Sequence, residues 1–453
     1  MGRSARLRRV DFGLASGESC RVSLRSSDLP VAVIGAGGAG LLAAAALRRA
    51  GVAFEVLEAR DGVGGTWRYD EDGSGSACYR SLVANTSKLR MSVGRKRIPG
   101  RPWEYASHTE MLAYLEDLAR DEDLLPSIRF GWTVAGARQD DGRWTLVEKE
   151  GEERAYGAVV CALPTSGRPR FAQLPGRYDG EQLHSAAYRT PERFAGKDVL
   201  VVGLGTSGGE VAGDIAGTAR SVQVSVRSPL WMMTRRIGGL PIDWIDNPWL
   251  ARVLPWSMRR QVLAGLCKAT TGGLHKYGLP RPTRRCGDDI LAVSDTFPRA
   301  VRRGLVAFRP AVHSAEGRRV RFVDDTSAEV DAIVHATGFE PPTDFLPEHA
   351  RPAPRSLYQG IAHTEAPNLL FVGMMEAHRA LLPIADDQAA WVADVLSDRI
   401  ALPGDDERRS AAARFAERRL RDFGDRREYM VDHAKYRAML RRDRSRRGNG
   451  RRG

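Results

Sequence analysis

The sequence predicts an α/β protein built from two Rossmann-like dinucleotide-binding domains. Two strand-like segments, the apolar residues 31–34 and residues 198–202 with four apolar residues after Asp198, are each followed at once by a glycine-rich turn and a helix-like segment. Continuous apolar runs are typical of parallel strands that are buried on both faces. The length of 453 residues fits this prediction, because ~150 residues per domain gives two or three domains.

The first glycine turn, residues 35–40, has the spacing of a pyrophosphate-binding turn. Gly35 permits the tight turn, and Gly37, next to Gly38, leaves room for the close approach of a pyrophosphate. Gly40 lets the helix pack closely on the strand. The alternative reading is a glycine-rich turn that binds no ligand.

The segments after this turn support nucleotide binding. A helix expected over residues 41–50 would direct its free N–H groups and its dipole at the pyrophosphate. A second strand, residues 54–57, ends at Glu58, 23 positions after Gly35, which is where a ribose-binding acid belongs. The turn therefore predicts a site for an unphosphorylated adenosine, as in FAD or NAD.

A second glycine turn repeats the pattern with the opposite charge at its decisive position. Gly203, Gly205 and Gly208 have the same spacing, with Thr206 and Ser207 between them. We expect a helix over residues 210–219 and a strand over residues 221–226 to follow.

That strand ends at Arg227, 24 positions after Gly203. An arginine at this point accommodates a 2′-phosphate, and Ser228 could add a hydroxyl donor. The second site is therefore predicted to take NADP, although a solvated surface arginine is the alternative for Arg227. Two dinucleotide folds in one chain imply electron transfer between two cofactors, and the usual pair is FAD and NADPH.

The two motifs suggest an FAD-binding domain that is interrupted by an inserted NADP-binding domain. We expect a disordered basic arm over residues 1–29 and an Arg-rich tail over residues 441–453. Between them we expect a first FAD-binding segment (30–167), an NADP-binding domain (168–331) with a helical Trp-rich region (229–280), and a second FAD-binding segment with a C-terminal helix (332–440).

The net charge of +13 does not by itself predict a nucleic-acid partner, because it is concentrated at the ends of the chain. Residues 1–29 carry +3 and residues 405–453 carry +8, which leaves +2 for residues 30–404. We expect no nucleic-acid partner. A homodimer is one expected assembly.

Neither a membrane segment nor a metal site is expected. The uncharged run over residues 29–47 contains Pro30 and four closely spaced glycines, so a strand, turn and helix explain it better than a membrane span. No apolar segment follows the basic N-terminus, so no signal peptide is expected. The five cysteines include no Cys-x-x-Cys pair and the histidines show no metal spacing, so we expect a cytoplasmic protein without a metal.

Six further segments resemble the flavin-containing monooxygenase family. Residues 64–67 are similar to its glycine-glycine-x-tryptophan element, and residues 178–189 to its identifying motif, with Tyr178 in place of phenylalanine. The other segments that resemble the family are residues 79–91 with Asn85, 335–339 with Thr337 and Gly338, 367–373 followed by Gln388, and Val431-Asp432 with Tyr436. One element departs from the family pattern, because residues 161–164 replace its usual threonine-glycine-histidine turn.

The resemblance implies an enzyme that uses FAD, NADPH and O₂ to oxygenate a small molecule through a flavin C4a-hydroperoxide. It implies a catalytic role for Asn85, near the flavin, whereas a plain turn residue is the alternative reading. His184 is expected to be structural. The further residues proposed to bind cofactors are Arg60, Gly65, Thr66, Trp67, Thr337, Gly338 and Gln388.

Several readings stay open at this stage. The ending Tyr188-Arg189 of the identifying motif favours N- or S-oxygenation. One alternative is a Baeyer–Villiger enzyme that acts on ketones. The other is a non-catalytic nucleotide- or nucleic-acid-binding protein. A helix from Asp386, capped by Asp386 and Asp387, is expected to point its N-terminus at the flavin. The Trp-rich stretch over residues 229–260 could be core packing, a substrate channel or a membrane contact.

Overall fold

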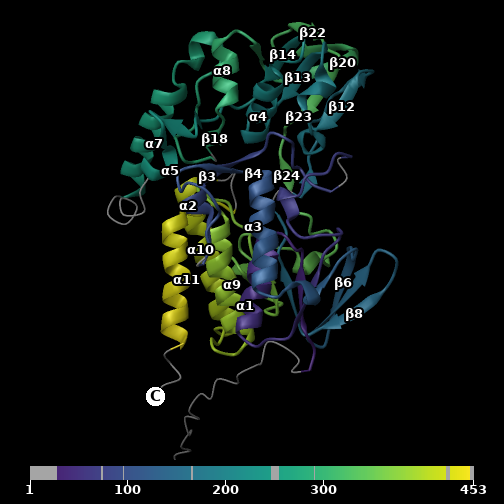
Figure 1. The fold of residues 1–453 in the computed structure, drawn as a ribbon, viewed down its shortest axis with the longest axis vertical. Helices are drawn as coiled ribbons and strands as arrows, with labels where there is room; N and C mark the ends of the chain where they lie inside the picture. Colours follow the sequence, from purple (N-terminus) through teal and green to yellow (C-terminus); the bar gives the residue numbers. More distant parts are fainter. Residues whose placement is uncertain are drawn as a thin grey trace, which may run out of the picture.

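A computed structural model describes residues 28–72, 75–94, 96–164, 167–245, 255–289, 291–424 and 429–448. It contains two α/β bodies stacked along the long axis of the molecule (Figure 1). The prediction of two Rossmann-like domains is confirmed. The expected basic arm lies outside the described residues apart from residues 28 and 29.

The larger body is centred on a seven-stranded sheet with the order β25-β26-β27-β9-β1-β2-β5. Its strands are β1 (Val31–Ile34), β2 (Phe54–Leu57), β5 (Ile128–Arg129), β9 (Ala158–Cys161), β25 (Leu357–Tyr358), β26 (Ala362–His363) and β27 (Leu369–Phe371). Strand β1 lies between β2 and β9 and is parallel to both, and all four of its residues are buried. The apolar run that predicted this strand is thus explained by burial on both faces.

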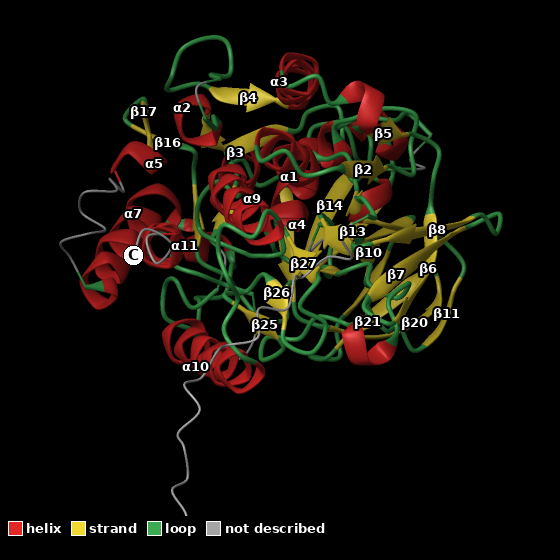
Figure 2. Ribbon diagram, turned by 90° about the horizontal axis from the view of Figure 1, so that it is seen from below, coloured by secondary structure: helices red, strands yellow, loops and turns green. Residues whose placement is uncertain are grey.

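Two layers cover this sheet. Helices α1 (Gly38–Arg49), α3 (His108–Asp121) and α9 (Leu382–Leu396) lie together on one face, where Val31 and Val33 join the largest apolar core (Figure 2). On the other face a three-stranded sheet of β6 (Val134–Asp140), β7 (Arg143–Glu148) and β8 (Glu153–Tyr156) packs against Ala32 and Ile34.

The second body repeats the design with five parallel strands in the order β12-β23-β13-β14-β19. They are β12 (Glu181–His184), β13 (Asp198–Val202), β14 (Ser221–Ser225), β19 (Val306–Arg309) and β23 (Ala332–His335). Helices α4 (Thr206–Ile215) and α8 (Thr296–Arg302) pack on one face. The four strands β11 (Gly176–Tyr178), β20 (Val312–Gly317), β21 (Arg319–Phe322) and β22 (Ser327–Glu329) cover the other.

The chain crosses between the bodies twice, and the two crossings lie side by side. Strand β10 (Arg168–Pro169) pairs in antiparallel fashion with β24 (Phe339–Glu340). In chain order, the second body is inserted between β9 and β25 of the first sheet. The unusual residues 161–164 end β9 in the normal way, because the Ala162 N–H still donates to Ile34 O at 3.0 Å.

Three helices begin three or four residues before the predicted positions. Helices α1, α4 and α9 begin at Gly38, Thr206 and Leu382. Pro383 is the second residue of α9, where its missing N–H group costs no helical hydrogen bond. The prediction that Asp386 and Asp387 cap this helix is therefore wrong.

Asp387 instead anchors the last helix of the chain, α11 (His433–Gly448). Its carboxylate pairs with Arg437 at 2.5 Å and with Arg441 at 3.1 Å. Trp391 Nε1 also donates to Asp443 at 2.8 Å. These contacts explain why α11 continues to Gly448, beyond the position 440 at which the sequence placed its end. Helix α10 (Asp405–Phe423) packs beside β25.

The Trp-rich region forms a small subdomain with its own apolar core. It contains β15 (Met232–Met233), β16 (Arg236–Ile237), β17 (Leu240–Pro241), α5 (Ile242–Ile245) and α7 (Trp256–Thr271), while residues 246–254 lie outside the described ranges. Its core includes Met233, Ile242, Leu263 and Cys267. Within the described ranges, no helix combines the length and apolarity needed to cross a bilayer.

Candidate active site

The first glycine turn is required by the fold at both of its ends. Gly35 has φ +100°, and a Cβ on Gly40 would lie 1.8 Å from Gly35 O, so no side chain fits there. Gly38 opens α1, and a Cβ on it would lie 2.5 Å from the side chain of Leu382 on α9. These three glycines allow strand, turn and helices to pack closely.

Gly37 has a different environment, which fits a cofactor-binding role. A Cβ on Gly37 would lie 3.5 Å from Gly65 Cα, and a Cβ on Gly65 would lie 2.9 Å from Gly37 Cα. The turn and the segment Gly65–Trp67, a 3₁₀ helix that includes Thr66, therefore meet backbone to backbone. Such bare backbone, at the N-terminus of α1, suits an anionic pyrophosphate.

Glu58 lies beside this turn at the end of β2. Its carboxylate is buried, and it accepts hydrogen bonds from the N–H groups of Ala36 at 2.6 Å and Arg60 at 3.0 Å. Arg60 Nη1 donates to Gly65 O at 3.3 Å, and the Arg60 guanidinium pairs with Asp70. The sequence-predicted residues Glu58, Arg60 and Gly65 are thus brought together around the first turn.

The second glycine turn has the same construction. Gly203 has φ +102°, and a Cβ on Gly208 would lie 2.2 Å from Gly203 O. In both bodies the carbonyl that follows the neighbouring strand lies against the first glycine: Ala162 O is 3.1 Å from a Cβ built on Gly35, and Ala336 O is 2.6 Å from one built on Gly203.

Gly205 differs from its neighbours in the turn, because a Cβ on it would meet no atom within 4 Å in the described structure. It caps α4, whose first two residues are Thr206 and Ser207. Packing therefore does not require a glycine at this position, whereas the close approach of a phosphate would.

Arg227 and Ser228 follow β14, as the sequence predicts. Arg227 is exposed and Ser228 is half-buried. Within the described part of the chain, the Arg227 guanidinium has no carboxylate partner, so it is available to an incoming anion. A 2′-phosphate ligand and a solvated surface arginine both require this exposure.

His184 and the second crossing of the chain hold each other in place. The Ala186 N–H donates to His184 Nδ1 at 3.1 Å, so His184 Nε2–H donates to Gly338 O, also at 3.1 Å. Burial lowers the pKa of His184, which favours this neutral form. Thr337 O accepts from Arg170 Nη2 at 3.1 Å, so Thr337 and Gly338 are also bonded within the protein.

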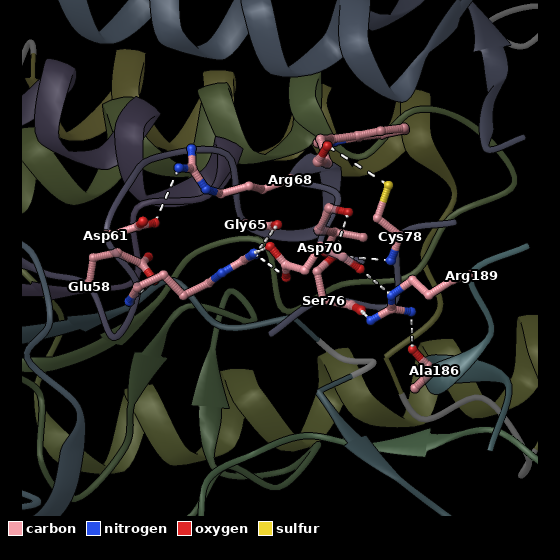
Figure 3. Close-up of polar contacts among 12 residues, drawn as sticks. Glu58, Asp61, Gly65, Arg68, Asp70, Ser76, Cys78, Ala186 and Arg189 are labelled. Carbon is pink, nitrogen blue, oxygen red and sulfur yellow. Dashed lines mark hydrogen bonds and ion pairs between the residues drawn. The ribbon is translucent and has the colours of Figure 1, made fainter. Parts of the chain in front are cut away.

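Arg189, the last residue of the identifying motif, joins the two bodies. It donates to Asp70 O at 2.6 Å and Ser76 O at 2.5 Å in the loop after Gly65–Trp67, and to Ala186 O and Tyr188 O at 2.7 Å (Figure 3). The motif therefore clamps a loop of the first body onto the second. The nearby Cys78 is buried, and this burial raises the pKa of its thiol to about 11.

Gln388 is fully buried, and both ends of its amide are used within the protein. Its Oε1 accepts from the Gly373 N–H at 2.8 Å, and its Nε2 donates to the Tyr436 hydroxyl at 2.9 Å. It thereby links the end of β27 to α9 and α11. A role of Gln388 toward a cofactor would be exerted through Gly373.

Asn85 lies on β3 (Val83–Ser87), at the junction of the two bodies (Figure 1). Its side chain is exposed, and its Oδ1 accepts from Arg235 Nη2 at 3.0 Å. Arg235 also lines a cavity of about 400 Å³ to which both bodies contribute. Sequence reasoning missed Arg235 and its acidic partners Glu210 and Asp295. The available signal was the arginine pair Arg235-Arg236, which follows the apolar residues 231–233 after one threonine.

The chain belongs to the flavin-binding monooxygenase-like family, whose model matches residues 29–441. It is 28% identical over 416 residues to flavin-containing monooxygenase 5 of Oryctolagus cuniculus, covering 87% of this chain and 78% of that protein. It is 31% identical over 415 residues to a human protein named putative dimethylaniline monooxygenase [N-oxide-forming] 6, covering 83% and 74%.

Solved structures share this fold. The S-allyl-L-cysteine S-oxygenase of Allium sativum superposes with a TM-score of 0.67 at 24% identity, covering 92% of this chain and 88% of that one. Cyclohexanone monooxygenase from Rhodococcus sp. Phi1, bound to NADP⁺, gives a TM-score of 0.72 at 19% identity, covering 93% and 98%.

The family membership makes the chain a flavin-dependent monooxygenase that uses FAD and NADPH. The residues present fit these groups. The first turn offers bare backbone at Gly37 and Gly65 beside the carboxylate of Glu58, and the second offers the open position Gly205 with Arg227 at the end of the next strand. The family resemblance read from the sequence is confirmed.

Proposed function

We propose that the enzyme transfers one oxygen atom of O₂ to a nitrogen or sulfur atom of a small molecule. The observation that carries this proposal is the placement of Asn85, an exposed amide at the junction of the two nucleotide-binding bodies. Two related proteins bear the names of an N-oxide-forming monooxygenase and an S-oxygenase, which supports the choice of a soft nucleophile as substrate.

Each candidate site residue has a role that its surroundings permit. The N–H groups around Gly37 and Gly205 bind the two pyrophosphates, Glu58 accepts hydrogen bonds from a ribose, and Arg227 binds the 2′-phosphate of NADPH. When bound, FAD supplies the electron transfer and the activation of O₂. Asn85 donates an amide N–H into the reaction space at the junction of the two bodies.

A soft nucleophile needs no deprotonation by the protein. This agrees with the state of the two carboxylates around Arg235, the partner of Asn85, because both are already paired. Glu210 and Asp295 are both engaged by Arg235, at 3.1 Å and 3.5 Å. They serve to hold that arginine rather than to act as general bases. A cytoplasmic location, a homodimer and the absence of a nucleic-acid partner stay predictions from the sequence.

The test is a substrate panel with the purified FAD-loaded enzyme. With NADPH and air, we expect a tertiary amine or a thioether to give an N-oxide or S-oxide, at the expense of one NADPH per product. An ester formed from a cyclic ketone, without any N- or S-oxide, would favour Baeyer–Villiger chemistry and overturn the proposal. Asn85→Ala serves as the control, because it should consume NADPH with little product.

A further inference from the structure

Arg235 is a buried cation that bridges the two bodies. It lies between β15 and β16 of the second body and is only 6% exposed. From there its guanidinium reaches β3 of the first body, where it donates to Ala84 O at 3.3 Å, Val83 O at 3.4 Å and Asn85 Oδ1 at 3.0 Å.

The chemistry of this contact fixes the orientation of the Asn85 carboxamide. A guanidinium group can only donate hydrogen bonds, so the amide oxygen must face Arg235 and the NH₂ group must point away from it. Within the part of the chain that the structure describes, Asn85 Nδ2 has no acceptor, and the residue is exposed. Two N–H donors are therefore held on the open side of β3.

Arg235 is itself held firmly by acidic residues of the second body. Glu210 on α4 pairs with it at 3.1 Å, and Asp295, just before α8, pairs with its side chain at 3.5 Å and accepts from its backbone N–H at 2.8 Å. Glu210 is also buried, so the pair leaves little freedom for rotation. Because α4 begins at the second glycine turn, Arg235 connects the NADP-binding helix to Asn85.

A second contact holds β3 on the other side of Asn85. The buried Asp243 on α5 accepts from the Ser87 N–H at 2.9 Å and from the Ser87 hydroxyl at 2.7 Å. The Trp-rich region therefore braces the strand that carries Asn85 at two points, Arg235 and Asp243. This bracing gives the region a role that its composition alone does not reveal.

We propose that Arg235 is a positioning residue that fixes the Asn85 carboxamide with its nitrogen outward. The catalytic consequence rests on the proposed function, since it requires Asn85 to donate during oxygen transfer. The orientation of the Asn85 carboxamide does not rest on the proposed function, so the orientation and its catalytic consequence can be tested separately.

The orientation is tested by NMR on protein labelled with ¹⁵N-asparagine. The chain has only four asparagines, and the signals that disappear in Asn85→Asp identify Asn85. In FAD-loaded protein we expect Arg235→Met to move the side-chain NH₂ signals of Asn85 and leave the other three in place. The control Arg236→Met removes the exposed neighbouring cation and should leave all four unchanged.

Arg235→Lys covers the case in which Arg235→Met fails to fold. A lysine keeps a buried positive charge for Glu210 but lacks the planar fork that reaches β3. It should therefore also move the Asn85 signals. Unchanged Asn85 signals in a folded Arg235 variant would overturn the proposal.

The catalytic consequence is tested by the ratio of hydrogen peroxide released to oxygenated product formed while NADPH is consumed. We expect Arg235→Lys to raise this ratio by roughly tenfold, the effect of one lost hydrogen bond to a charged group. In an Asn85→Ala background the same change should add nothing, because the two residues act through one amide. The proposal would be contradicted if the effects of Arg235→Lys and Asn85→Ala on this ratio multiplied independently. It would also be contradicted if a loss of FAD affinity in Arg235→Lys alone accounted for the change in the ratio. If the wild-type enzyme oxygenates no substrate, the proposed function fails, but the NMR result still decides the orientation.

Discussion

The second glycine turn offers a sharp separation between folding and cofactor binding. Gly205 and Gly208 are three residues apart in one turn, yet their surroundings are opposite. A Cβ on Gly205 would meet no atom within 4 Å, whereas a Cβ on Gly208 would lie 2.2 Å from Gly203 O. We therefore predict that Gly205→Ala impairs only NADPH binding and that Gly208→Ala impairs the fold.

The magnitudes follow from the backbone geometry. Gly205 has φ −98° and ψ −165°, which alanine adopts without strain, so its substitution should change the free energy of unfolding by less than about 1 kcal/mol. The same methyl group would block the approach of a phosphate and raise the KM for NADPH by roughly tenfold or more. Gly208→Ala forces a carbonyl out of its position and should cost roughly 2 kcal/mol, in the range of an overpacked core.

The assay combines urea unfolding with initial rates of NADPH oxidation for both variants and the wild type. Retention of FAD serves as the internal control, since the first glycine turn is untouched. An unchanged KM in Gly205→Ala would refute the assignment of the second turn to NADPH. Equal destabilisation by both substitutions would refute the inference that packing does not require a glycine at position 205.

Three further predictions concern the charges. Arg227→Ala should raise the KM for NADPH roughly tenfold and change the KM for NADH much less, measured by initial rates, because only NADPH carries the 2′-phosphate. Arg189→Met leaves four carbonyl contacts unmade and should cost about 3 kcal/mol of unfolding free energy and loosen FAD, whereas the exposed Arg177→Met should do neither in the same urea and flavin-release assays. Burial lowers the pKa of His335 to about 4. Its contribution to stability is therefore full above pH ~6.5 and falls toward pH 4 by at most roughly 3 kcal/mol, and His335→Gln should flatten this part of the pH–stability curve.

The sequence predicted those parts of the site that depend on local geometry. The two glycine turns, Glu58 and Arg227 follow from short spacings within one strand–turn–helix unit, and the structure places them at the expected ends of β2 and β14. The starts of the helices after the two glycine turns were predicted less accurately. The turn residues that carry the free N–H groups already belong to the helix. Helix α9 was expected from Asp386 but begins at Leu382, and Pro383 is its second residue.

Contacts between distant segments could not be read from the sequence. Arg235 and Asn85 are 150 positions apart, and Arg189 and Asp70 are 119 apart. Their pairing depends on how the inserted body docks on the first, which no periodicity encodes. For the same reason the contacts between the Trp-rich region and β3 could not be predicted from composition.

Oxygen transfer from O₂ is the central claim, and isotope labelling tests it most directly. The purified enzyme is incubated with NADPH, ¹⁸O₂ and whichever tertiary amine or thioether it oxidises, and the product is analysed by mass spectrometry. We predict an N-oxide or S-oxide that carries one ¹⁸O atom from O₂. A product whose oxygen derives from water, or NADPH consumption that yields hydrogen peroxide with every substrate of the panel, would contradict the claim.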